Sequence, residues 1–256
     1  MKGVTHIILT MLTVLVILAP LTNSFLTLAA IPAVILLLFG TFLGSLTPDI
    51  DKGKEAAIYH AEIPGAGGKK FHLTPIFGYV INYACYKPIH FVFRLIFGKK
   101  IYAIHGHREL PHSPIGILFI SAMLTAYICL LCFALSFLPY LGFLYNPALI
   151  FLFGIGFLLG CFLHLVEDTC DNSGIHYFYP FSFSRLRGTV RSDGTDKRPV
   201  IFAVILLFAA VILFSLTILR MIPTDFSSAL AVIVPIILWI LILKASGVPA
   251  RKEIRE

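Results

Sequence analysis

The sequence is poor in charged residues, which make up only 13% of its 256 residues, about half the usual share for a soluble domain. Hydrophobic residues make up 58%, and the mean hydropathy is +0.92. This balance excludes a soluble globular protein, whose water-facing surface needs more charge. The chain is therefore expected to be an integral membrane protein.

The five cysteines form no pattern that is typical of a disulfide framework. Cys129, Cys132 and Cys161 fall inside long apolar runs, where cysteine usually packs as a small hydrophobic residue. Cys129 and Cys132 form a C-x-x-C pair, but no histidine or further cysteine lies near them in the sequence, which favours packing over zinc binding. Thiolate metal ligands are not expected.

Six apolar runs are each long enough to cross a hydrocarbon core of about 30 Å, which needs roughly 20 helical residues. They predict an all-α, polytopic transmembrane helical bundle of about six spans. Residues 1–24 also resemble a signal peptide, but no small-x-small cleavage site stands near Asn23 and Ser24, so this segment is expected to be retained. The predicted spans are residues 4–22, 25–46, 115–141, 147–168, 200–221 and 226–245.

Basic residues lie almost entirely on one side of these spans. Short loops join spans one and two, three and four, and five and six, so the N-terminus, the segments 47–114 and 169–199 and the C-terminal tail share one face. That face carries 19 of the 20 Lys and Arg residues, and only Arg220 lies opposite. By the positive-inside rule, this face and both termini are expected to be cytoplasmic. The net charge of +7 is assigned to this topology, and no nucleic-acid binding is expected.

The segment 71–97 is apolar enough to resemble a seventh span, but a long cytoplasmic interfacial loop is expected there. Lys87, His90 and Arg94 interrupt it. Pro75 and Pro88 are expected to break helical continuity. Its many aromatic rings suit the lipid headgroup region. Short helices that pack on the bundle without touching lipid fit the pattern equally well.

Histidine and acidic residues gather at four predicted helix ends on the cytoplasmic face. Ionisable residues at such positions are costly unless they are paired, liganded or hydrated. His164 and Asp168 lie four residues apart and so project from one helix face, and Asp49 and Asp51 follow a helix that Pro48 helps to end. The clusters are His6 at span one, Asp49 and Asp51 after span two, His107, Arg108 and His112 before span three, and His164, Glu167 and Asp168 closing span four.

Imidazoles and carboxylates together are typical ligands of Zn²⁺, Mn²⁺ and non-haem iron. Taken alone, Asp49 fits a turn cap, His6 an interfacial histidine, and Arg108 either an interface anchor or a bidentate phosphate contact. Ser113 before Pro114 fits a helix N-cap. Convergence on one face favours a divalent metal site over these separate roles. The other histidines, His60, His72, His90 and His176, are expected to be ordinary loop or interfacial residues.

Four ordered motifs resemble the YdjM-like family, membrane-bound metal-dependent hydrolases formerly classed as a domain of unknown function. The motifs are Thr5-His6, L-x-P-D-I-D at 46–51, H-R-x-x-x-H-S at 107–113, and H-x-x-x-D at 164–168 with Gly174 and Tyr179-Pro180-Phe181-Ser182 after it. The likeness covers residues 1–187 and leaves 188–256 as a C-terminal pair of spans with a basic tail. The resemblance implies a metal site made of His6, Asp49, Asp51, His107, His112, His164 and Asp168.

Gly106, Pro111 and Asp171 depart from the residues common in the family, and Asp171 would add a carboxylate. The H-x-x-x-D element is also distantly similar to zinc-dependent phospholipase C and P1-type nucleases. We therefore expect a metal-dependent hydrolase of the plasma (inner) membrane that holds one or two ions, zinc or manganese, and acts at the cytoplasmic face on a phosphate ester or lipid-linked substrate. Glu167 is assigned proton transfer, and Arg108 the phosphate.

The alternative function is a non-enzymatic metal carrier or sensor that uses the same residues. A transport path should continue polar residues to the far side of the membrane. The predicted spans carry almost no ionisable residues away from the cytoplasmic ends, which disfavours a conduit.

Overall fold

The computed structural model describes residues 3–22, 30–60, 63–64, 70–71, 74–98, 108, 110–182 and 184–248. In this part of the chain nearly all regular structure is helical, and the two strands, β1 (Ile63–Pro64) and β2 (Lys70–Phe71), form one short antiparallel pair. The prediction of an all-α bundle is confirmed. The long helices are α1 (Gly3–Leu18), α3 (Ile31–Leu46), α7 (Pro114–Ser136), α8 (Pro147–Cys170), α9 (Arg198–Ile218) and α10 (Thr224–Ala245).

Five helices in the described residues are long and apolar enough to cross a membrane: α1 with its extension η1 (Ala19–Leu21), α7, α8, α9 and α10. A sixth span results if α3 is counted together with the 3₁₀ helix η2 (Pro48–Glu55), which bends away from it by 62°. The bend comes at Pro48, which has no backbone N–H to continue the α-helical hydrogen bonds and whose ring crowds the preceding turn. The prediction of about six spans agrees with this count.

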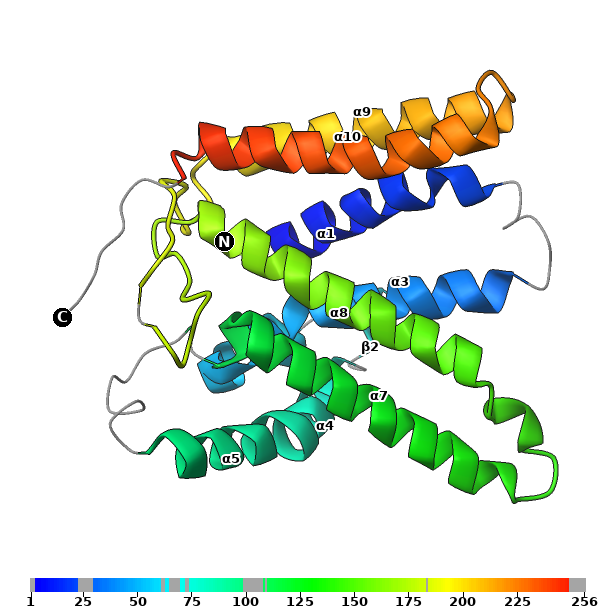
Figure 1. Ribbon diagram of the computed structural model, residues 1–256, viewed down its shortest axis with the longest axis vertical. Coiled ribbons are helices and arrows are strands. Elements are labelled where there is room, and N and C mark those ends of the chain that lie inside the picture. The colour runs from blue at the N-terminus through cyan, green and yellow to red at the C-terminus, as the bar shows by residue number, and fades with distance from the viewer. Residues whose placement is uncertain are drawn as a thin grey trace.

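The helices pack so that the ends predicted to meet lie at one end of the bundle. Figure 1 shows the first turns of α1 and α7 and the last turns of α3 and α8 at the same end, where the loop between α8 and α9 also lies. Helix α8 packs against α3 and α7, whereas α9 and α10 lie side by side over α1. Short 3₁₀ helices complete this end and the far loop: η3 (Ala57–Tyr59), η6 (Leu110–His112) and η7 (Gly142–Leu144).

Glycines bring α3 and α8 into direct backbone contact. A Cβ atom added at Gly44 would lie 2.1 Å from the carbonyl oxygen of Phe157, and one added at Gly160 would lie 2.2 Å from the carbonyl oxygen of Thr41. No side chain larger than hydrogen fits at these distances, which is the small-x-x-x-small packing of membrane helices. The glycines are Gly40 and Gly44 on α3 and Gly156 and Gly160 on α8.

The segment after β2 is more helical than expected. It forms α4 (Thr74–Val80), the π-helix η5 (Ile81–Tyr86) and α5 (Lys87–Phe97) without a break. The prediction that Pro88 interrupts the helix was wrong. Proline is tolerated in the first turn of a helical segment, and the π turn before it shifts the hydrogen-bond register. An interfacial position for this helix stays a prediction.

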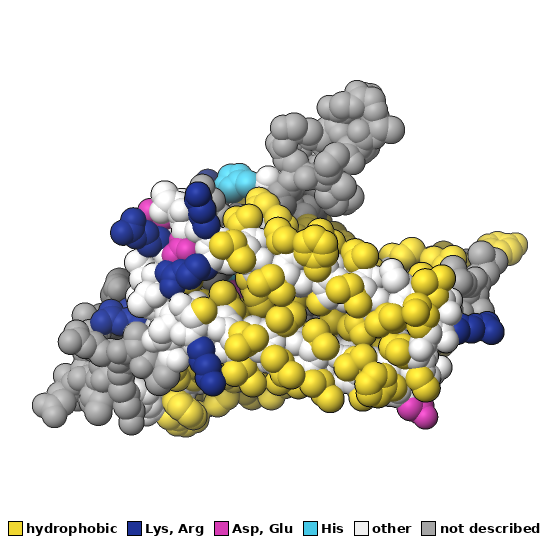
Figure 2. All heavy atoms as spheres, turned by 90° about the horizontal axis from the view of Figure 1, so that it is seen from above, with side chains coloured by type: hydrophobic (Ala, Val, Ile, Leu, Met, Phe, Trp, Pro, Cys, Tyr) yellow, Lys and Arg dark blue, Asp and Glu magenta, His cyan; other side chains and the backbone are white. Residues whose placement is uncertain are grey.

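The outer surface matches a protein that lies in lipid. Figure 2 shows hydrophobic side chains covering the middle of the face formed by α9 and α10, with charged side chains at its two ends. Large apolar residues such as Phe208 on α9 and Ile236 on α10 are more than half exposed. Such a continuous apolar surface is stable only against lipid or a partner. The chain is a multi-pass membrane protein.

Candidate metal centre

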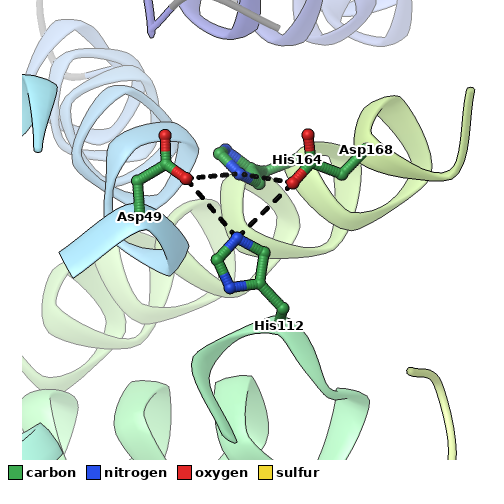
Figure 3. Close-up of side chains that lie close together, drawn as sticks. All are labelled: Asp49, His112, His164 and Asp168. Atoms are coloured by element: carbon green, nitrogen blue, oxygen red, sulfur yellow. Dashed lines mark ion pairs between the residues drawn. The ribbon is translucent and has the colours of Figure 1, made fainter. Parts of the chain in front are cut away.

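Four side chains from three parts of the chain converge at the polar end of the bundle. Asp49, His112, His164 and Asp168 are all buried, and one ligand atom from each lies within 4.8 Å of the other three. Figure 3 shows the four side chains pointing toward one another. Two imidazoles and two carboxylates are a donor set that suits zinc or manganese.

Local structure explains how each side chain reaches this point. The bend between α3 and η2 turns Asp49 toward α8, where His164 and Asp168 stand one helical turn apart. His112 closes η6, directly before Ser113, whose hydroxyl accepts a hydrogen bond from the backbone N–H of Gly116 at 3.0 Å and caps α7. The predicted N-cap is thus confirmed, and it fixes the backbone beside His112.

His164 is held in one tautomer. Its Nδ1 atom donates a hydrogen bond to the carbonyl oxygen of Ser45 at 2.7 Å, so the Nε2 atom carries the lone pair. That Nε2 atom is buried and has no hydrogen-bond partner among the described residues. It lies 3.8 Å from Oδ1 of Asp49 and 3.6 Å from Oδ2 of Asp168. The Nε2 lone pair is therefore buried and faces two carboxylates, while Nδ1 is hydrogen-bonded to the protein. This is the arrangement expected of a histidine that binds a metal ion.

The spacing of the four atoms fits an ion. The Nε2 atom of His112 lies 3.5 Å from Oδ1 of Asp49 and 3.4 Å from Oδ2 of Asp168. Ligands about 2.0 to 2.1 Å from a tetrahedral zinc ion are about 3.3 to 3.4 Å apart. Contacts of 3.4 to 3.8 Å between imidazoles and carboxylates therefore leave room for one ion at the centre after a slight contraction.

Negative charge dominates around His112. Burial alone lowers the pKa of this imidazole, but the carboxylates of Asp51, Asp168 and Asp49 outweigh burial and raise the pKa to about 10. Asp51 lies behind the ring, with Oδ2 3.5 Å from Nδ1 of His112. The raised pKa shows that the carboxylates give this site an excess of negative charge. A bound divalent cation would neutralise that excess.

The family is settled by sequence comparison. Residues 1–248 match the family model described as YdjM inner membrane protein. The chain belongs to this family. The match confirms the predicted resemblance and runs on through α9 and α10, while the division of the chain at residue 187 stays a prediction. No curated protein and no solved structure is significantly similar to the chain.

His6 and Glu167 form a buried pair beside the four converging side chains. The Nδ1 atom of His6 is hydrogen-bonded to Oε2 of Glu167, whose Oε1 accepts a hydrogen bond from the hydroxyl of Thr10 at 2.9 Å. The His6 ring stacks on His164 with centroids 3.9 Å apart, and its Nε2 lies 3.6 Å from Oδ1 of Asp168. Glu167 is thus linked to the four side chains through His6, a contact that the sequence does not predict.

Arg108 lies on the other side of Asp168. Its Nη2 donates to Oδ1 of Asp168 at 3.0 Å and to Oδ2 of Asp171 at 3.1 Å, and its Nη1 donates to the carbonyl oxygen of Gly174 at 3.1 Å. The backbone N–H of Arg108 donates to Oδ2 of Asp51 at 2.9 Å. The guanidinium is engaged with protein oxygens, and its predicted contact with a phosphate stays a prediction.

Of the seven predicted ligands, the structure brings four together as a compact group. Asp51 lies behind the group, against the His112 ring. His6 lies beside the group, against Asp168. His107 lies outside the described residues. Two further groups contact these residues and were not predicted. The backbone carbonyl of Ser45 cannot be found from any pattern of side chains. Thr10 could have been found, because it lies one helical turn after His6.

Proposed function

We propose that this protein is a membrane-embedded hydrolase that uses a divalent metal ion held by Asp49, His112, His164 and Asp168. The observation that carries the proposal is the buried Nε2 atom of His164, which faces two carboxylates and makes no hydrogen bond among the described residues. Burying such an acceptor is costly unless a cation binds it. When bound, a divalent ion lowers the pKa of a coordinated water towards neutrality.

The chain supplies the groups that orient the ligands and handle protons. The Ser45 carbonyl and Asp51 hold the outer nitrogens of His164 and His112. Glu167 anchors Nδ1 of His6 and leaves its Nε2 facing Asp168, where His6 is placed to take up or deliver a proton beside the ligands. In this proposal His6 transfers the proton and Glu167 holds the His6 ring, whereas the sequence had assigned proton transfer to Glu167 alone.

A lipid-linked phosphate ester is the substrate class that the surroundings favour. An apolar groove of about 480 Å³ lies between α5 and α7 and is also lined by Phe181 of the loop after α8. Its lining on α7 consists of Ile115, three residues after His112, together with Phe119 and Met123. A hydrocarbon chain in this groove would place its polar head near the metal centre.

We place the centre at the cytoplasmic face of the membrane. The described basic residues lie predominantly at its end of the bundle, among them Lys52, Arg108, Arg185 and Arg191, whereas Arg220 follows the last turn of α9 at the far end. The positive-inside rule assigns the more basic end to the cytoplasm.

A metal sensor or carrier without enzymatic activity is the second candidate, and the burial of the centre favours it. His112, His164 and Asp168 are inaccessible to solvent, and four protein side chains would be enough to fill the ligand shell of a four-coordinate ion. Structural zinc sites are closed in this way, whereas catalytic sites keep one position open. The two candidates differ in whether the loaded protein turns over an ester.

Metal analysis of the protein purified in detergent without chelators tests the proposal first. We expect stoichiometric zinc or manganese in the wild type, and loss of most of it in His164→Ala and Asp168→Asn. His90→Ala is the matched control, because His90 lies on α5 outside the centre. A wild-type protein that binds no divalent ion after incubation with zinc and manganese would refute the proposal.

Turnover separates the two candidates. The loaded wild type and the Asp168→Asn variant are compared on bis(p-nitrophenyl) phosphate and on phosphatidic acid in mixed micelles. Metal-dependent release of product by the wild type alone supports the hydrolase. Stoichiometric metal with no turnover of any phosphate ester supports the sensor or carrier.

A further inference from the structure

The two oxygens of Asp168 face two different positive sites. Oδ2 faces the imidazoles of His112 and His164, at 3.4 and 3.6 Å, where the ion of the proposed function would bind. Oδ1 faces Nη2 of Arg108 at 3.0 Å, with Nε2 of His6 at 3.6 Å. In two-metal hydrolases a carboxylate often bridges two ions about 3.5 to 4 Å apart. Here the second side of the bridging carboxylate is taken by a guanidinium.

Arg108 is built into this position. The side chain is 7% exposed, and its two terminal nitrogens donate to Asp168, Asp171 and the carbonyl oxygen of Gly174. Its backbone has a φ of 79°, in the left-handed region that a side chain rarely adopts, and its N–H donates to Asp51. Such a strained conformation persists only where surrounding contacts impose it. A planar guanidinium fixed at both terminal nitrogens behaves as a stationary positive charge.

The charges in and around the centre balance with a single divalent ion. Among the described aspartates, Asp49, Asp51, Asp168 and Asp171 lie in or beside it, against the positive charges of Arg108 and Lys52, which pairs with Asp49 at 2.7 Å. These six groups carry a net charge of −2, which one divalent ion neutralises, and the buried Glu167 is counted separately with its partner His6. A second ion would leave an excess of positive charge in a buried site, which is costly.

We propose that Arg108 occupies the place of a second metal ion, so that the centre holds one divalent ion with the guanidinium as its fixed partner charge. This inference rests on the proposed function, since it assumes that the four ligands bind an ion. It predicts that removing the guanidinium creates a second cation site, whose ligands are Oδ1 of Asp168, Oδ2 of Asp171 and Nε2 of His6.

The test is the number of Mn²⁺ ions per chain, measured by equilibrium dialysis and elemental analysis in detergent. We expect about one ion in the wild type and in Arg108→Lys, and about two in Arg108→Ala and in the bulkier, uncharged Arg108→Gln. The double variant Arg108→Gln with Asp171→Asn is the matched control. It removes a positive and a negative charge together and should return to about one ion.

Electron paramagnetic resonance gives a readout that a merely structural role for Arg108 would not change. Two Mn²⁺ ions bridged by Asp168 give an exchange-coupled spectrum in Arg108→Gln, whereas the wild type gives that of an isolated ion. Arg108→Ala leaves two buried carboxylates without the guanidinium, so excess Mn²⁺ should raise its unfolding temperature more than that of the double variant.

The outcomes are distinguishable. A wild type with two ions, or a folded Arg108→Gln variant with one ion and an uncoupled spectrum, overturns the role of Arg108 and leaves the proposed function intact. A wild type with no ion refutes the proposed function itself.

Discussion

The imidazole of His164 donates a hydrogen bond to the backbone carbonyl oxygen of Ser45, and this contact joins the metal centre to the packing of two helices. Ser45 lies in the last turn of α3, directly after Gly44, whose contact with Phe157 sets the distance to α8. The orientation of a candidate metal ligand therefore depends on glycines that lie outside the centre. Chemistry and packing are coupled through one backbone carbonyl.

Gly44→Ala should weaken both the fold and the centre. The added Cβ would lie 2.1 Å from the carbonyl oxygen of Phe157, so α3 and α8 must move apart, at a cost of about 1 to 3 kcal/mol in the free energy of unfolding. The same movement pulls Ser45 from His164. We expect a lower unfolding temperature in detergent and reduced metal content. Gly142→Ala is the control, because its Cβ meets nothing closer than 4.0 Å. Unchanged stability and metal content in Gly44→Ala would contradict this account.

The sequence was sufficient to predict the bundle and the end at which the polar residues meet. Apolar runs predicted the spans, with some ends misplaced by five or six residues, as at Ser136 of α7 and Ile31 of α3. The alternation of long and short connections placed His6, Asp49, His112 and His164 at one end. The G-x-x-x-G spacing on α3 and α8 is also visible in the sequence, and it predicts close packing when it is considered.

The sequence could not predict which of the polar residues join the group of four and which lie beside it. That depends on how each helix is rotated and on the path of each loop. Asp49 and Asp51 are chemically identical and two residues apart, yet the 3₁₀ turn directs one toward Asp168 and the other behind His112. The partners of Arg108 include a backbone carbonyl in the loop after α8. No periodicity in the sequence specifies such a contact. The effect of Pro88 was wrongly predicted for a related reason: the π-helix Ile81–Tyr86 precedes it, so that Pro88 lies in the first turn of α5, where proline is tolerated.

The metal-free protein should lose stability as the pH rises. Carboxylates raise the pKa of His112 from the ordinary 6.5 to about 10, despite burial, which lowers it. A raised pKa contributes stability that is complete below about pH 6.5 and disappears as the pH approaches 10. We expect the unfolding temperature of chelator-treated protein to fall over this interval. Metal-loaded protein should show a flatter profile, because a bound ion requires neutral His112.

His112→Gln tests the assignment of that profile. It removes the titrating imidazole, so the pH dependence of the chelator-treated variant should flatten between about pH 7 and 10. A wild-type stability that rises with pH in this interval, without metal, would contradict the electrostatic description of the centre.

Cysteine labelling tests the cytoplasmic placement of the centre. His60 and Asp193 are exposed at the end of the bundle that holds the centre, and Tyr140 is 96% exposed in the loop between α7 and α8 at the other end. We expect a membrane-impermeant maleimide to label Tyr140→Cys in intact cells, and His60→Cys and Asp193→Cys only in inverted vesicles. Wild-type protein controls for the native cysteines. The reverse pattern would place the centre on the outer face.

Glu167→Gln should separate proton transfer from metal binding. The amide keeps the size of the side chain and its contact with Thr10, but it no longer holds the His6 ring through a carboxylate. None of the four proposed ligands is changed. We expect metal content to stay near that of the wild type while metal-dependent turnover falls by about 10² to 10⁴.

Thr10→Val should reproduce this loss on a smaller scale, of about tenfold, because it removes one hydrogen bond to the Glu167 carboxylate. Thr41→Val is the matched control: its hydroxyl donates to the carbonyl oxygen of Leu37 within α3 and does not reach Glu167. If Glu167→Gln loses its metal, Glu167 acts on the ligands themselves. If turnover persists at the wild-type rate, the couple of His6 and Glu167 is structural, and proton transfer must be assigned to another group.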